Sequence, residues 1–193
     1  MSPRKNTFIA VVLTSCSLLT ASQTVADNRS PATIGAQAGY YRMKATTATN
    51  DLTIAEFGIF NIEYKAPFTD YSMLSAGYSM YTQGTAVQDL GYGLDVGGDF
   101  YPAGLLNKKI ADEKFLTWTA RRPWAYFLGA RFSQRQYQSI QASYAGLCGL
   151  AGFELSLTNE LKVQLLVRAL TLKGPQGAKI AETNALLGLF RDL

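Results

Sequence analysis

The stretch that decides the fold runs from Val87 to Tyr101 and reads VQDLGYGLDVGGDFY. Between Leu90 and Phe100, the even positions are apolar or aromatic apart from one glycine, whereas the odd positions are only glycine and aspartate. Because successive side chains of a β-strand point to opposite faces, this pattern predicts a strand with one apolar face and one polar face. Such a strand fits a soluble sandwich, whose polar face meets water, or a membrane barrel, whose apolar face meets lipid.

Seven further segments alternate in the same way, with turn signals between them. The predicted strands are about 11–15 residues long, whereas globular strands average about five or six and a tilted membrane strand needs about 9–11. Long strands in an even number predict an all-β fold, an eight-stranded antiparallel up-and-down transmembrane β-barrel. The predicted strands cover residues 34–45, 52–65, 71–82, 87–101, 124–135, 143–157, 161–172 and 179–191.

The composition favours β structure and argues against several classes of function. The chain has 17 glycines, 11 tyrosines and 10 phenylalanines, and it has no histidine. Without histidine, Ser-His-Asp and Cys-His nucleophilic sites are excluded and the commonest zinc ligand is missing. A formal net charge of +4 is weak evidence for a nucleic-acid partner. We therefore expect no nucleic acid, no metal and no cofactor.

The first 26 residues are typical of an export signal. Two basic residues precede an apolar segment, and small residues at 24–26 offer a cleavage site. A rival interpretation treats residues 13–16 as a lipobox, in which Cys16 would become the lipidated first residue of the mature protein. The predicted organisation is a signal peptide at 1–26, a short polar segment at 27–32 and a β-barrel domain at 33–193.

Charged residues recur on the polar faces of the predicted strands. Asp95 and Asp99 lie on the fourth predicted strand and Arg131 and Arg135 on the fifth, so the acids and bases could pair across the lumen wall. Side chains just fill the interior of an eight-stranded barrel, and paired charges offset part of the desolvation cost. We predict a static salt-bridged core, with an ion path or gated plug as the alternative. The predicted lumen network comprises Glu63, Asp89, Asp95, Asp99, Arg131, Arg135, Glu154, Lys162 and Arg168.

The longest predicted connection, residues 103–123, interrupts the alternation and is rich in basic residues. A short helix fits within it. A solvated connection is the simplest interpretation, and contact with anionic lipid headgroups or with a periplasmic partner such as a cell-wall polymer is the alternative. The candidate contact residues are Lys108, Lys109, Lys114, Arg121 and Arg122.

Aromatic residues gather at the predicted strand ends beside this connection, where membrane barrels carry interfacial girdles. Elsewhere, Cys148 is the single cysteine left after removal of the signal peptide. No base accompanies it, so we interpret Cys148 as a wall residue and not as a nucleophile. The predicted girdle residues are Tyr101, Trp118, Trp124 and Tyr126.

The sequence resembles the small eight-stranded outer-membrane barrels of Gram-negative bacteria, such as the OmpA transmembrane domain, OmpX and OmpW. The resemblance covers residues 33–193 and rests on the signal segment, the GYGLDVGGDFYP run, the aromatic residues near strand ends and the terminal strand. Gly188 and Leu193 match part of the assembly signal of such barrels, whereas Arg191 stands where an apolar residue is usual. The resemblance implies an integral outer-membrane location, membrane lipid as a partner, the barrel-assembly machinery during biogenesis, and periplasmic termini.

These features favour a non-enzymatic outer-membrane barrel with a structural or interaction role in the cell envelope. The enzymes known on such barrels use a catalytic histidine beside serine, so we predict no catalytic residues. One alternative is a porin-like narrow channel for small solutes or apolar ligands. Another is a periplasmic or lipid-anchored soluble barrel that binds a small apolar ligand, which would need the apolar faces of the strands to point inward.

Overall fold

The computed structural model describes most of the chain after the predicted signal peptide. The predicted signal peptide at 1–26, which includes Cys16, lies outside the described residues, as do Asp89 and Lys114. The described residues are 30–46, 51–82, 90–105, 107–111, 117–137 and 142–193.

Eight long strands form the wall of a closed barrel. Their bounds lie close to the predicted ones because the alternation of apolar and polar residues continues along each strand. The wall strands are β1 (Thr33–Thr46), β2 (Asp51–Thr69), β3 (Ser72–Thr82), β4 (Leu90–Phe100), β7 (Trp124–Tyr137), β8 (Ala142–Ser156), β9 (Leu161–Lys173) and β10 (Lys179–Asp192).

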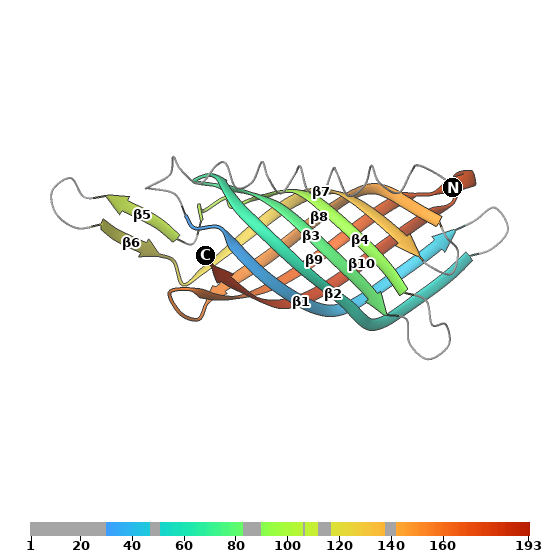
Figure 1. Cartoon of the computed structure of the whole chain (residues 1–193), viewed down its shortest axis with the longest axis horizontal. Coiled ribbons are helices and arrows are strands. Elements are labelled where there is room, and N and C mark those ends of the chain that lie inside the picture. Colours follow the sequence, from blue (N-terminus) through green and yellow to red (C-terminus); the bar gives the residue numbers. More distant parts are fainter. Residues whose placement is uncertain (1–29, 47–50, 83–89, 106, 112–116, 138–141) are drawn as a thin grey trace, which may run out of the picture.

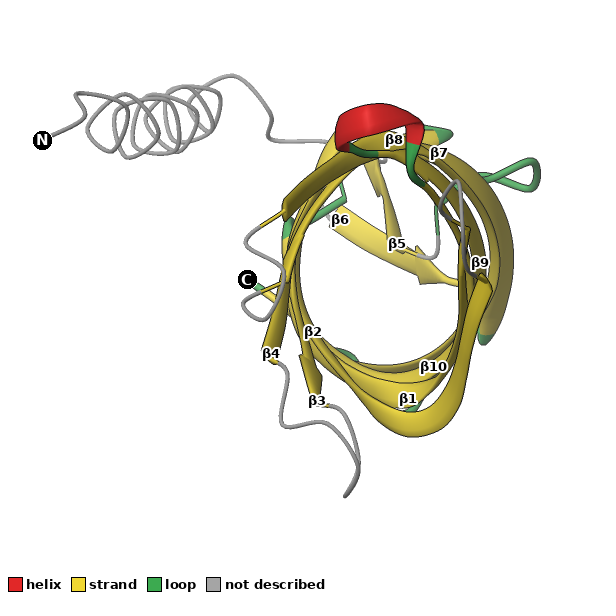
Figure 2. Cartoon of the chain, turned by 90° about the vertical axis from the view of Figure 1, so that its right-hand side faces the viewer, coloured by secondary structure: helices red, strands yellow, loops and turns green. Residues whose placement is uncertain are grey.

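Each wall strand pairs antiparallel with the next wall strand along the chain, and β1 pairs with β10 to close the ring. The order around the ring is β1-β10-β9-β8-β7-β4-β3-β2 (Figures 1 and 2). A short 3-10 turn (Pro175–Gly177) joins β9 to β10. The prediction of an all-β, eight-stranded antiparallel barrel is confirmed. No helix among the described residues is long and apolar enough to cross a membrane.

The two faces of the wall differ in polarity. Outward positions carry exposed apolar side chains such as Ile62, Val96 and Leu147, whereas the charged residues of the same strands point inward and are buried. On β9 the outward apolar residues run from Leu161 to Ala169, a length that suits a tilted membrane strand. The soluble alternative, with the apolar faces inward, is therefore wrong.

Two bulges in β2 break its alternation. Against β1, the register shifts so that Gly39 lies opposite Ile59 and Tyr40 opposite Phe57, which leaves Gly58 as the extra residue. The prediction of one uninterrupted alternation through this strand is wrong, because a bulge reverses which residues share a face. The second bulge lies after Pro67, and it lets β2 continue through the turn predicted at 66–70.

The connection between β4 and β7 contains a two-stranded hairpin, formed by β5 (Asn107–Ala111) and β6 (Thr117–Arg121). The expectation of a short helix here is wrong. Ile110 lies opposite Trp118 in the hairpin, and β-branched and aromatic residues favour a strand over a helix. The hairpin lies beyond the end of the barrel where β1 begins and β10 ends (Figure 1). We call this end of the barrel the terminal rim and the opposite end the far rim.

The outward apolar belt generates a test of membrane insertion. Leu165, half-way along the belt on β9, is 51% exposed in the isolated chain. Leu165→Arg should lower the free energy of unfolding by about 2–4 kcal/mol, because a charge near the bilayer midplane is poorly solvated. Urea titration of the protein in lipid vesicles, followed by gel mobility without boiling, measures the change. Thr171→Arg, at the far rim of the same strand, is the matched control and should lower the free energy of unfolding by only about 0–1 kcal/mol. An equal loss of stability in the two variants would contradict the assignment of the apolar belt to the lipid-facing surface.

Candidate functional site

The barrel interior holds two groups of buried charges, and the first surrounds Asp99. The Arg131 guanidinium bonds to Glu63 and donates through Nη2 to both carboxylate oxygens of Asp99, at 2.7 and 2.9 Å. Lys65 Nζ lies 2.9 Å from Asp99 Oδ2 and 3.6 Å from Glu154 Oε1. These residues come from β2, β4, β7 and β8, so the group, which we call the Asp99 cluster, ties half of the wall strands together.

The second group, the Asp95 cluster, lies further toward the far rim. Two arginines contact Asp95, with Arg135 Nη2 at 2.9 Å and Arg168 Nη1 at 3.1 Å. The hydroxyl of Ser133 donates to the same carboxylate. Arg135 also donates through Nε to the Tyr81 hydroxyl, at 2.6 Å, and that hydroxyl donates to a buried glutamate of β10. Each buried charge in this cluster therefore has a charged or hydroxyl partner.

Uncharged polar side chains join the two clusters. Gln164 donates to Glu154 at 2.6 Å and accepts from Gln37 at 2.6 Å, and Gln37 accepts from Asn61 at 2.8 Å. The Ser79 hydroxyl then lies 3.0 Å from Asn61 Oδ1 and 3.2 Å from the Asp95 carboxylate. One continuous polar network thus runs along the barrel interior.

Apolar and aromatic side chains fill the interior beyond the Asp95 cluster, toward the far rim. The Tyr137 ring packs edge-on against Tyr144 at 5.9 Å, and its hydroxyl donates to the Met43 sulfur at 3.2 Å. Leu172 and Ile180 are cross-strand partners and are both fully buried. The sequence predicted only a plug of paired acids and bases, so this apolar plug was missed. The inward alternation of β9 and β10 could have revealed it.

Inward glycines make room for the large interior side chains. Gly93 lies opposite Arg135, and a Cβ atom on Gly93 would sit 2.5 Å from the guanidinium. Likewise, Gly152 lies opposite Phe127, and a Cβ atom there would sit 2.2 Å from the aromatic ring. A larger residue at either position would therefore force the Arg135 or Phe127 side chain to move. The glycines of the polar faces are therefore part of the interior packing.

The structure buries every predicted lumen charge that it describes. Asp89 lies outside the described residues, and Lys162 pairs with Asp192 at 2.6 Å, at the terminal rim. The predicted network omitted several members, although alternation along β1, β2, β3 and β10 places each of them on an inward position. The omitted network members on these four strands are Gln37, Asn61, Lys65, Ser79, Tyr81, Glu182, Asn184 and Asp192. Ser133 on β7 and Gln164 on β9 were omitted as well.

The predicted aromatic girdle is only partly on the outer surface. Trp124 and Tyr126 are exposed on β7, and the Trp124 ring stacks 6.0 Å from Phe153. The prediction for Tyr101 is wrong, because this residue is fully buried and its hydroxyl donates to Glu154 at 2.8 Å. Tyr101 follows the outward Phe100, so alternation turns its side chain inward. Trp118 lies on the β6 strand of the hairpin.

The hairpin carries most of the predicted basic contact residues. Lys108 and Lys109 lie on β5, and Arg121 lies on β6 opposite Asn107. Arg122, just after the hairpin, is exposed. Lys114 belongs to the part of the chain that is not described. The hairpin therefore presents a basic segment beyond the terminal rim of the barrel.

Metal-binding side chains do not gather into a site within the part of the chain that the structure describes. No group of three His, Cys, Asp or Glu side chains in this part could hold a metal ion. Cys148 is 2% exposed and faces the interior, where its thiol lies 3.7 Å from the Gly149 carbonyl oxygen. The interior side chains thus link the strands of the wall to one another.

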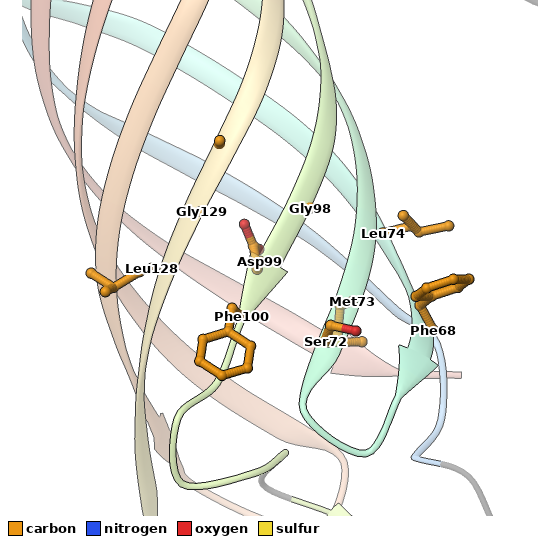
Figure 3. A pocket seen from close by; sticks show the side chains of 10 residues that line it. Phe68, Ser72, Met73, Leu74, Gly98, Asp99, Phe100, Leu128 and Gly129 are labelled. Atoms are coloured by element: carbon orange, nitrogen blue, oxygen red, sulfur yellow. The ribbon is translucent and has the colours of Figure 1, made fainter.

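A shallow hollow of about 400 Å³ lies on the outer surface of the wall, across β3, β4 and β7 (Figure 3). In its middle Gly98 lies between its two cross-strand partners, Leu74 and Ala130, and the larger Phe100 and Leu128 stand beside it. The hollow is apolar and lies within the outward belt. It suits a lipid acyl chain better than a polar ligand.

Comparisons with known proteins match this chain by fold and not by sequence. No protein-family model and no curated protein match the sequence. The crystal structure of Neisserial surface protein A is similar with a TM-score of 0.57 and 15% identity, over 84% of this chain and 97% of that chain. The outer membrane protein OprG from Pseudomonas aeruginosa has a TM-score of 0.50 and 9% identity, over 86% of this chain and 97% of that one.

The closed ring, the outward apolar belt and these likenesses define the class of protein. The chain has the fold of the small eight-stranded outer-membrane β-barrels. The predicted resemblance to that class is confirmed, and the predicted integral outer-membrane location agrees with it. At 9–15% identity the likeness concerns the fold alone, so the role has to be argued from this chain's own residues.

The Asp99 cluster predicts that charge reversal at its centre destabilises the barrel. Arg131→Glu removes the cation that both Glu63 and Asp99 contact and adds a third carboxylate. The free energy of unfolding should fall by about 3 kcal/mol or more, because the buried carboxylates of Glu63 and Asp99 lose a cationic partner and gain a like charge. Heat-dependent gel mobility and urea titration in vesicles measure the change. Arg122→Glu, at an exposed position, should stay within about 0.5 kcal/mol; equal midpoints for the two variants would argue against the pairing.

Proposed function

We propose that this protein is a non-enzymatic, integral outer-membrane barrel with a structural or interaction role in the cell envelope. The observation that carries the proposal is that side chains from opposite walls meet inside the barrel. Lys65 on β2 reaches Glu154 on β8, and Arg168 on β9 reaches Ser79 on β3. In the ring of eight, β2 lies four strands from β8 and β3 lies four strands from β9, so each contact spans the full width of the interior.

A filled interior favours this role over a channel. Six buried acids and five buried bases among the described residues nearly balance, which leaves little net charge to attract a permeant ion. The apolar plug with Tyr137 and Leu172 lies across the same interior, nearer the far rim. A solute would have to displace both the paired charges and the plug. The missing histidine is a further argument against the catalysis known on barrels of this class.

We assign the interaction role to the β5–β6 hairpin. A two-stranded hairpin alone is marginally stable in water, so a hairpin that lies beyond a barrel is a suitable surface for a partner. Its basic residues Lys108, Lys109 and Arg121 would favour an anionic or hydrogen-bonding surface. With the terminal rim in the periplasm, the cell-wall polymer is such a partner. Contact with anionic lipid headgroups by the same bases is the alternative.

Conductance measurements test the closed interior. Wild-type protein in planar bilayers should give no unitary current steps, since contacts at two levels cross the interior. Lys65→Ala combined with Arg168→Ala removes the Lys65–Glu154 and Arg168–Ser79 contacts and should increase ion leakage, provided that its gel mobility shows a folded barrel. Regular current steps from the wild-type protein would overturn the structural role in favour of a narrow channel.

Sedimentation with purified peptidoglycan tests the hairpin. The wild-type protein in detergent should co-sediment with peptidoglycan, and replacement of residues 107–121 by a short glycine-serine linker should abolish this while leaving the heat-dependent mobility shift intact. The variant Lys108→Gln, Lys109→Gln, Arg121→Gln keeps the hairpin and should bind several-fold more weakly. Equal binding by the linker variant would rule out the hairpin as the contact surface.

A further inference from the structure

The far rim carries a patch of outward basic side chains that neither the barrel fold nor the hairpin explains. Arg42 and Lys44 lie on β1, Lys173 on β9 and Lys179 on β10, and all four are exposed. These three strands are consecutive in the ring. We call these four residues the rim patch.

The strand register brings the bases of the rim patch together. Lys179 lies directly opposite Lys173 on β9 and opposite Thr46 on β1, two residues beyond Lys44. Directly opposite side chains on one face have Cβ atoms about 5 Å apart, and like charges in such pairs destabilise a sheet. Since Lys173 and Lys179 share the outward face, their repulsion calls for an anion from outside the protein.

The acids closest to this pair in the strand register are not direct neighbours of Lys173 or Lys179. Glu182, on the same part of β10, points inward, where it accepts from Tyr81 and Asn184. On the neighbouring β2, Asp51 lies opposite Thr46 in the register and is therefore two strands away from Lys179. The terminal rim differs, because its exposed Arg191 pairs with Glu160 at 3.2 Å.

The level of the rim patch matches that of lipid headgroups. On β9 the outward apolar residues end at Ala169, and Thr171 and Lys173 follow on the same face. On β1 the sequence of outward residues is similar, with Tyr40 followed by Arg42. Long basic side chains just beyond an apolar belt lay their methylene groups along it and hold their charges in the headgroup layer.

We propose that the rim patch binds the phosphate groups of anionic lipid headgroups in the leaflet at the far rim. Arginine and lysine form charge-assisted hydrogen bonds with phosphate oxygens, and clusters of such bases beside a membrane recognise anionic lipids. A phosphate between Lys173 and Lys179 would neutralise their repulsion. The barrel would thereby retain a shell of anionic lipid on the β1-β10-β9 side, opposite in the ring to β3, β4 and β7, where the apolar hollow lies.

Lipid selectivity in vesicles tests the proposal. The probes are spin-labelled phosphatidylglycerol and spin-labelled phosphatidylcholine, each in phosphatidylcholine vesicles that contain the folded full-length protein. The wild-type barrel should restrict the anionic label in preference to the zwitterionic one by roughly fivefold, the effect of one cation at a membrane surface. The preference should shrink in high salt, which screens exposed charges.

The variant Arg42→Gln, Lys173→Gln, Lys179→Gln should lose the preference while keeping the heat-dependent mobility shift. Lys44 also interacts within the protein, so it is left unchanged. The matched control, Arg122→Gln with Arg191→Gln at the terminal rim, should keep the preference. If the triple variant fails to fold, Lys173→Gln with Lys179→Gln replaces it.

Three results would overturn the proposal. The first is a wild-type barrel without preference, and the second is a triple variant that retains it. The third is stabilisation of the detergent-solubilised protein by inorganic phosphate through the same three residues, with no selectivity for the anionic lipid. That result would make the rim patch a site for free phosphate.

Discussion

The structure depends on one constraint, which is that charges turned into a narrow barrel have to be neutralised by other side chains. Taking Arg131 or Asp99 out of water is costly, and their mutual contacts and those with Lys65 and Glu63 offset that cost. Such pairing adds little net stability, because the desolvation of the charges cancels most of their attraction. Asp95 is likewise paired with Arg135 and Arg168, since the narrow interior also keeps its charge away from bulk water.

This constraint explains several features that look unrelated in the sequence. Glycines such as Gly93 and Gly152 leave space for Arg135 and Phe127 on the neighbouring strand. The Gln164 amide donates to the Glu154 carboxylate, and the amides of Gln37 and Asn61 extend this chain of hydrogen bonds along the interior. The filled interior supports our proposal that this protein meets other molecules on its outside, at the hairpin, the apolar belt or the rim patch.

Much of the fold could be predicted from the sequence because alternation and strand length are local properties. The alternation of even and odd positions in 90–100 predicted which side chains point outward and which point inward. The length of the strands indicated a membrane barrel. The same rule assigns Asp95, Asp99, Arg131 and Arg135 to one face. It fails at Gly58, where a bulge reverses the faces, because the alternation of β2 was followed through a glycine that has no partner on β1.

The sequence by itself determined the class of fold, the polar face of each strand and the residue types that fill the interior. Only the tertiary structure decided which residues meet there, because closure of the ring sets β2 opposite β8 and brings Lys65 to Glu154. It also decided that Tyr101 closes the interior and that Lys173 and Lys179 stand side by side on the outside. Contacts between distant strands depend on register and closure, and no local pattern encodes either.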